Sequence, residues 1–269
     1  MRESPQWPRT GLLQWHKPFL NSELQVSSLR HLIVIPAYNE QEALPRTLAS
    51  LQSLDEAYEI LIVNDGSRDQ TGAVAEAFAL RCTRPVHVLH LPINAGIGVA
   101  VQTGYLFAAK SNRYRYVIQF DADGQHDFAA IEQLVAAAER DQLDLCIGSR
   151  FLPNQVDGYQ STLTRRFGIR FFSRLIYWLG GVRVTDPTSG LRCAGPRAWQ
   201  RFAKHYPEDY PEPETLFWCV RNKLNVGEIP VLMHPRQGGV SSIRPHHAAY
   251  YMLKVSLAIL LDRLRPKGH

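Results

Sequence analysis

Two aspartates and a glutamine follow one mostly apolar stretch of the sequence and form its clearest chemical signal. Residues 116–120 have the composition of a buried strand, and Asp121, Asp123 and Gln125 come directly after it. Alternate residues of an extended chain point to the same side, so the three side chains share a face. Hard oxygen donors of this kind suit Mg²⁺ or Mn²⁺ bound to a phosphorylated substrate. Taken alone, the same residues also fit a solvated turn after a strand.

Strand and helix patterns alternate along the first half of the chain. Apolar stretches predict strands near residues 32–35, 59–64, 86–89 and 116–120, and helices are predicted near 41–54, 69–81, 98–109 and 128–140. Strands that are apolar on both faces and joined by helices predict an α/β protein with a mostly parallel sheet and helices on both faces. Ligands bind beyond the carboxyl ends of such strands, so we expect a site built from residues 36–40, 65–69 and 121–125.

The 269-residue chain is predicted to hold one catalytic domain at 31–245, with an N-terminal extension at 1–30 and an amphipathic basic helix at 246–269. Its net charge of +5 is compatible with several kinds of anionic partner. The four cysteines lie far apart, which argues against a zinc site and a secreted disulfide framework. Without a signal-peptide pattern or an apolar stretch of spanning length, we expect a cytoplasmic protein, free or peripheral at the cytoplasmic face of the membrane.

Several short motifs, in a fixed order, carry a family resemblance. They are Pro36-Ala37-Tyr38-Asn39-Glu40, Asp65-Gly66-Ser67, Asp121-Ala122-Asp123, Gly148-Ser149-Arg150, the DPTSGLR segment at 186–192 and the RQGGVSS segment at 236–242. In this order and spacing they resemble the family 2 glycosyltransferases, which have the Rossmann-like GT-A fold. The last two segments resemble the branch of dolichol-phosphate mannose synthase and its bacterial polyprenyl-phosphate relatives.

The resemblance implies roles for the residues after the first, second and fourth strands. It assigns the nucleotide base and ribose to Pro36, Tyr38, Glu40 and Asp65, and the metal-bound diphosphate to the cluster at 121–125. Within that cluster we assign Asp123 and Gln125 as ligands of Mg²⁺ or Mn²⁺, and we place Asp121 with the nucleotide, reaching the ribose or the metal through water. A metal there would neutralise the charge that develops on the leaving diphosphate.

Catalytic and acceptor residues are assigned in the second half of the chain. The resemblance implies that Arg236 closes over the diphosphate from a glycine-containing loop, and residues assigned to acceptor or diphosphate loops are Arg150, Arg192, Ser241 and Ser242. Asp186 and Glu214 are candidates for a general base, which a sugar hydroxyl acceptor requires. A lipid phosphate is already anionic and requires none, in which case the two carboxylates orient the sugar or the acceptor. Glu214 also fits a carboxylate that interacts with a helix N-terminus.

The expected function is inverting transfer of a sugar from a UDP- or GDP-sugar to a polyprenyl phosphate. Arginines spaced by four beside aromatic residues in 162–179 fit a lipid phosphate and anionic headgroups, and they fit equally a solvated helix with an aromatic core face. Transfer to a saccharide hydroxyl in cell-surface polysaccharide synthesis is the main alternative. A sugar-phosphate nucleotidyltransferase and a non-catalytic nucleotide-sugar-binding scaffold are the others. We expect no nucleic-acid partner, and a homo-oligomer remains open.

Overall fold

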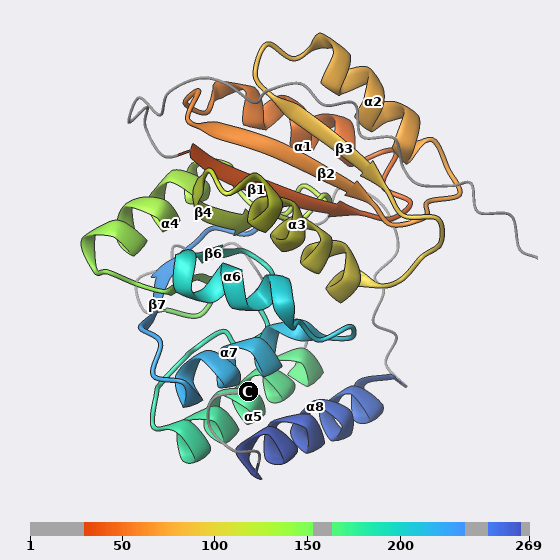
Figure 1. Ribbon diagram of the computed structural model, residues 1–269. Helices are drawn as coiled ribbons and strands as arrows, with labels where there is room; N and C mark the ends of the chain where they lie inside the picture. The colour runs from red at the N-terminus through yellow and green to blue at the C-terminus, as the bar shows by residue number, and fades with distance from the viewer. Residues whose placement is uncertain (1–29, 153–162, 235–246, 265–269) are drawn as a thin grey trace, which may run out of the picture.

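A seven-stranded sheet runs through the protein (Figure 1). The computed structural model describes residues 30–152, 163–234 and 247–264. Its strands are β1 (Arg30–Ala37), β2 (Tyr58–Asn64), β3 (Val86–His90), β4 (Tyr114–Gln119), β5 (Leu145–Ser149), β6 (Arg192–Ala194) and β7 (Val226–Pro230). They are arranged in the order β3-β2-β1-β4-β6-β5-β7, and every pair is parallel except the two pairs that β6 makes with β4 and β5. The predicted mostly parallel sheet is therefore confirmed.

Helices cover both faces of this sheet. They are α1 (Leu44–Ser50), α2 (Thr71–Arg81), α3 (Ile97–Ser111), α4 (Ala129–Arg140), α5 (Leu163–Gly180), α6 (Pro196–Lys204), α7 (Pro211–Arg221) and α8 (His247–Leu264). The helix predicted at 41–54 is shorter, because residues 41–43 form a turn, Pro45 lies in the first turn of α1 and Leu51–Ser53 form a 3-10 turn. Sequence patterns did not predict β6, α6 or β7.

Alternate residues of β1 enter two separate cores, one on each face of the sheet. Leu32 and Val34 pack with residues of α3, α6 and α7, whereas Ile33 and Ile35 pack with residues of α1 and α4. This is why the strand is apolar at nearly every position rather than at every second one. Two covered faces leave the strand ends as the place where polar side chains can gather.

The reversed direction of β6 brings an additional segment to the carboxyl edge of the sheet. Because β6 is antiparallel to β4 and β5, its first residue, Arg192, pairs with Gln119 at the end of β4. The residues that precede Arg192 therefore lie beside those that follow β4 and β5. This arrangement places the 186–191 segment next to Asp121.

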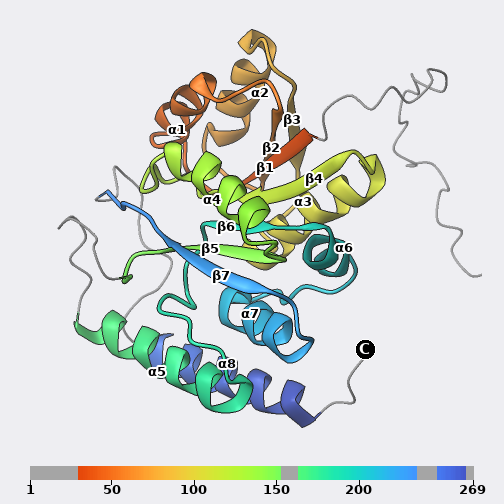
Figure 2. The ribbon, with the colours of Figure 1, turned by 90° about the vertical axis from the view of Figure 1, so that its left-hand side faces the viewer.

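Helices α5 and α8 lie side by side on the far side of α7 from the sheet (Figure 2). Val255 and Ile259 on α8 are buried in the same core as α7, and the rings of Phe172 and Tyr251 pack edge to face. The C-terminal helix, predicted as a separate region, thus packs against α5 and α7. Among the helices described, none combines the length and hydropathy needed to cross a membrane.

Candidate active site

The segments after β1 and β2 are held together by hydrogen bonds between loops. The backbone N–H of Asn39 donates to Ser67 Oγ at 3.0 Å, and that of Glu40 donates to Thr71 Oγ1 at 2.8 Å. Asn39 has a φ of 53°, a left-handed conformation that asparagine tolerates, which turns the chain sharply after Tyr38. Tyr38 is exposed at this edge, whereas Pro36 is buried inside β1. The turn therefore leaves the Tyr38 ring exposed at this edge, while Pro36 stays within the strand.

Asp65, at the end of β2, shapes the neighbouring loop. Its two carboxylate oxygens accept hydrogen bonds from the backbone N–H groups of Ala95 and Gly96, at 2.8 and 3.0 Å. These N–H groups lie just before α3, where a helix leaves donors without intrahelical partners. The buried carboxylate thus fixes the start of α3 beside the predicted nucleotide site.

The predicted metal ligands lie together after β4, and their side chains have defined orientations. Asp123 Oδ1 accepts a hydrogen bond from the backbone N–H of Gln125 at 3.1 Å. The side-chain Nε2 of Gln125 donates to the His234 carbonyl at 3.3 Å, and the His234 N–H returns a bond of 2.7 Å to the Gln125 carbonyl. Because the amide nitrogen of Gln125 donates to His234, the amide oxygen is the atom that would bind a cation.

This donor set fits a magnesium or manganese ion that is bound partly by its substrate. Within the described ranges, no group of three or more histidine, cysteine, aspartate or glutamate side chains is placed to bind a metal. Mg²⁺ commonly takes one or two protein carboxylates and completes its shell with phosphate oxygens and water. Asp123 and Gln125 would hold the ion, and a nucleotide diphosphate would supply further oxygens.

Arg150 and Asp186, both predicted to meet substrate, bind each other in this structure. The Arg150 guanidinium donates to both Asp186 oxygens, and both residues are buried. Glu228 on β7 accepts bonds from the backbone N–H groups of Thr185 and Asp186, at 2.7 and 2.8 Å. The pair sits beneath the site and holds the start of the 186–191 segment, so its geometry favours a structural role for Asp186 over a general base.

Arg192 is likewise engaged by protein groups and fully buried. Its guanidinium donates to the carbonyls of Ser189, Pro187 and Glu212 and to the Thr215 hydroxyl, over distances of 2.7 to 3.1 Å. It therefore ties the turn before β6 to the first turn of α7.

Glu212 is the residue near Asp121 that sequence reasoning missed. Burial raises the pKa of Glu212, the charge of Arg192 opposes that rise, and the nearby Asp121 adds to it. Glu214, predicted instead, faces α8: burial raises its pKa to about 7, with Lys254 opposing. Residues two apart on a helix do not share a face, so helical spacing alone could have shown that only one of the two glutamates faces the strand ends.

Three predicted residues, Arg236, Ser241 and Ser242, lie outside the described residues. Of the remaining predicted residues, Pro36 lies within β1, Glu214 lies on α7, and the others separate into two groups. Tyr38, Glu40, Asp65, Asp121, Asp123 and Gln125 lie in the segments after β1, β2 and β4. Arg150, Asp186 and Arg192 form the packed layer beside them.

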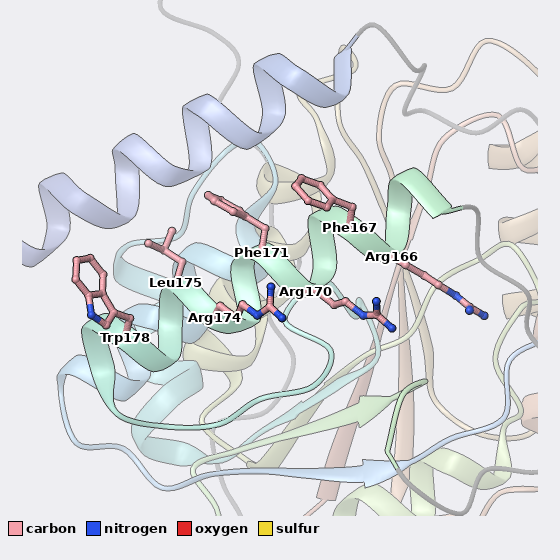
Figure 3. A pocket seen from close by; sticks show the side chains of 7 residues that line it. All are labelled: Arg166, Phe167, Arg170, Phe171, Arg174, Leu175 and Trp178. Carbon is pink, nitrogen blue, oxygen red and sulfur yellow. The ribbon is translucent and has the colours of Figure 1, made fainter.

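A hollow of about 600 Å³ runs along α5 (Figure 3). Its lining residues are Arg166, Phe167, Arg170, Phe171, Arg174, Leu175 and Trp178. Figure 3 shows the aromatic side chains and Leu175 projecting on the side of α8 and the three arginines projecting from another side of the helix. Cationic and apolar side chains thus lie in parallel rows on one helix.

Comparison with known proteins places this site in a family. Residues 32–203 match the family described as glycosyl transferase family 2. The polyprenol monophosphomannose synthase of Mycolicibacterium smegmatis is 30% identical over 88% of this chain and 90% of its own. The UDP-N-acetylglucosamine–dolichyl-phosphate N-acetylglucosaminyltransferase of Methanococcus voltae is 30% identical over 74% of this chain and 83% of its own.

Solved structures share the fold at lower identity. Glucosyl-3-phosphoglycerate synthase from Mycobacterium tuberculosis, in complex with Mg²⁺ and UDP, superposes with a TM-score of 0.66 at 18% identity, covering 94% of this chain and 88% of its own. The mostly parallel sheet and its helices are thus those of a GT-A glycosyltransferase. The chain belongs to glycosyltransferase family 2, in the branch whose members include polyprenyl-phosphate glycosyltransferases.

Proposed function

We propose that this protein transfers a sugar from a nucleotide-diphosphate sugar to a polyprenyl phosphate, with inversion at the anomeric carbon. The names of its relatives support the acceptor, since they include a polyprenol monophosphomannose synthase and an undecaprenyl-phosphate mannosyltransferase. The oxygen ligands after β4, beside the turn that presents Tyr38, support a UDP- or GDP-sugar donor. The observation that carries the proposal is the surface formed by α5 and α8.

That surface combines exposed apolar side chains with arginines. On α8, Val255 and Ile259 face the core, and exposed leucines are Leu253, Leu257, Leu260, Leu261 and Leu264. On α5, Phe167 and Trp178 are exposed beside Arg166, Arg170 and Arg174. Contiguous exposed apolar surface with adjacent cations is typical of proteins that bind a membrane interface. We propose that this face rests on an anionic bilayer, where a polyprenyl phosphate resides.

The chemistry follows from an acceptor that is already charged. An oxygen of the lipid phosphate attacks the anomeric carbon from the side opposite the nucleotide, the bond to the diphosphate breaks, and the nucleoside diphosphate leaves with the electron pair. A bound Mg²⁺ or Mn²⁺ would neutralise charge on that leaving group. Asp123 and Gln125 would hold the ion, and Asp121 would orient the donor. The burial of Asp186 in its ion pair is compatible with a nucleophile that needs no base.

A saccharide hydroxyl is the second candidate acceptor, and Glu212 favours it. Its pKa is raised by burial, which is a common property of a carboxylate that accepts a proton during catalysis. In that reaction Glu212 would deprotonate the hydroxyl as it attacks.

The two acceptors are distinguished by one set of assays. We would incubate the protein with Mn²⁺, radiolabelled UDP- and GDP-sugars and either undecaprenyl phosphate, undecaprenol or a soluble saccharide. We expect label in the lipid fraction with undecaprenyl phosphate alone, and Glu212→Gln should retain transfer. Label in the saccharide, lost in Glu212→Gln by roughly 10²-fold or more, would instead support the hydroxyl acceptor. EDTA provides the metal-free control.

A further inference from the structure

The segment from Thr185 to Arg192 is clamped at both ends by charged residues. Glu228 accepts hydrogen bonds from two backbone N–H groups at its start, and Arg150 binds the Asp186 carboxylate with two. At its other end, Arg192 donates to two carbonyls of the same segment and to α7. A segment held by buried charge-assisted hydrogen bonds has little freedom to shift. Its backbone is therefore a rigid surface for whatever packs against it.

Gly190 in this segment packs directly against the carboxylate of Asp121. A methyl group added at Gly190 would lie 2.7 Å from Asp121 Oδ2 and 3.1 Å from Oδ1, and its three nearest neighbours are all atoms of that carboxyl group. On another side, Nε2 of the buried His126 lies 3.7 Å from the same Oδ2. The carboxylate is thus confined by a bare stretch of backbone and by an imidazole.

Backbone conformation does not require glycine at this position. Gly190 is not among the residues with a positive φ, so an alanine would fit the backbone. What the glycine provides is space for the carboxylate, because an oxygen at 2.7 Å is closer than carbon and oxygen atoms normally pack. With the segment clamped, relief of that clash falls on the Asp121 side chain.

We propose that Gly190 is a positioning residue for Asp121, and that the bare backbone at 190 sets the orientation in which this carboxylate serves the nucleotide donor. The inference rests on the proposed function for the role of Asp121. In this proposal, the glycine of the DPTSGLR segment acts by positioning the side chain of Asp121. Misplacement of a reacting or orienting group by about 1 Å can cost on the order of 10²-fold in rate.

The test compares Gly190→Ala with Gly168→Ala by calorimetric titration with UDP and with GDP, with and without Mn²⁺. Gly168, on α5, has no atom within 4 Å of an added methyl group, so it controls for the loss of a glycine. We expect Gly190→Ala to weaken the Mn²⁺-dependent binding by about tenfold or more, in line with a displaced orienting group. Gly168→Ala should bind as the wild type does. Equal binding by wild type and Gly190→Ala would overturn the proposal.

A double variant separates positioning from general damage to the fold. In an Asp121→Ala background the added methyl meets no carboxylate, so Gly190→Ala should there change neither the melting temperature nor nucleotide binding. If Gly190→Ala lowered nucleotide binding or the melting temperature by a similar amount in that background, the clash would lie elsewhere and the proposal would be overturned. This holds even if the Gly190→Ala single variant folds poorly. If the wild type bound neither nucleotide with Mn²⁺, the proposed donor site would fail, and this inference with it.

Discussion

Arg150 and Asp186 form a two-pronged ion pair in the interior of the protein: Nε lies 2.6 Å from Oδ2, and Nη2 lies 2.7 Å from Oδ1. The Arg150 backbone N–H donates to the same carboxylate. Nothing of Asp186 is exposed. A buried ion pair of this kind stabilises the fold around a site. Its loss should therefore lower the free energy of unfolding before it changes the reaction.

Asp186→Asn should therefore destabilise the protein before it affects chemistry. Removing the charge of one partner leaves the other buried and uncompensated, which typically costs about 3–5 kcal/mol. The measurement is urea unfolding followed by fluorescence. Asp141→Asn is the matched control, because Asp141 also pairs with an arginine through two hydrogen bonds but on the exposed surface. Equal losses for the two variants would contradict this interpretation.

Asp123→Ala should remove the effect of metal on nucleotide binding while leaving the melting temperature nearly unchanged. Its carboxylate belongs to the oxygen cluster after β4, and it accepts a local hydrogen bond from the backbone N–H of Gln125. Titration of UDP and GDP with and without Mn²⁺ measures the effect. Asp127→Ala, which removes a nearby carboxylate that accepts a hydrogen bond from the N–H of Ala129, the first residue of α4, is the control. A persistent metal enhancement in Asp123→Ala would place the ion elsewhere.

Glu214 should make stability depend on pH near neutrality. Burial raises its folded-state pKa to about 7 from the ordinary 4.5, so the folded state binds a proton that the unfolded state has released between these values. Stability therefore falls as pH rises from 4.5 to 7, because ionisation of the folded carboxyl is disfavoured. Glu214→Gln should flatten this slope and should be more stable than the wild type above pH 7.

Melting temperatures of the two proteins across this range provide the measurement. If the melting temperatures of wild type and Glu214→Gln changed in parallel with pH, Glu214 would be ionised in the folded protein across the whole range. Glu59 gives a contrasting case: burial would raise its pKa, but hydrogen bonds from His87 and Tyr114 and the charges of Arg113 and Arg30 outweigh burial and lower it to about 2. The contribution of the ionised Glu59 carboxylate to stability is present above pH 4.5 and is lost as pH falls toward 2.

Leu253→Glu should weaken binding to anionic liposomes without unfolding the protein. Leu253 is 70% exposed on α8, so its replacement alters the outer surface and not the core. Co-sedimentation with vesicles of phosphatidylglycerol and phosphatidylcholine measures binding. Leu80→Glu, at an 87% exposed leucine on α2, is a matched control that should leave binding intact. Similar losses in both variants would count against a specific α5–α8 surface.

Strands β1 and β2 were predictable from sequence because they are nearly continuous apolar runs, whereas β6 and β7 were not predicted. Only three residues long, β6 carries the fully buried Arg192, whose charge conceals a strand pattern. Residue types also located the oxygen cluster after β4. They could not show that Arg150 and Arg192 bind protein groups, since an arginine suits a carboxylate of the chain as well as a phosphate. The role of Arg236 remains a prediction.

The placement of β6 between β4 and β5 has a consequence for how the chain is made. Translation releases β1 to β4 first, and at that stage β4 is an open edge with unpaired backbone groups. Its partner on that side appears only after the whole of α5 has been synthesised. Exposed strand edges favour association with other chains, so the nascent protein is most at risk of aggregation in this interval. A ribosome that stalls between residues 149 and 192 would therefore hold a chain in which the residues of β1 to β5 have been made and β4 still lacks its partner β6.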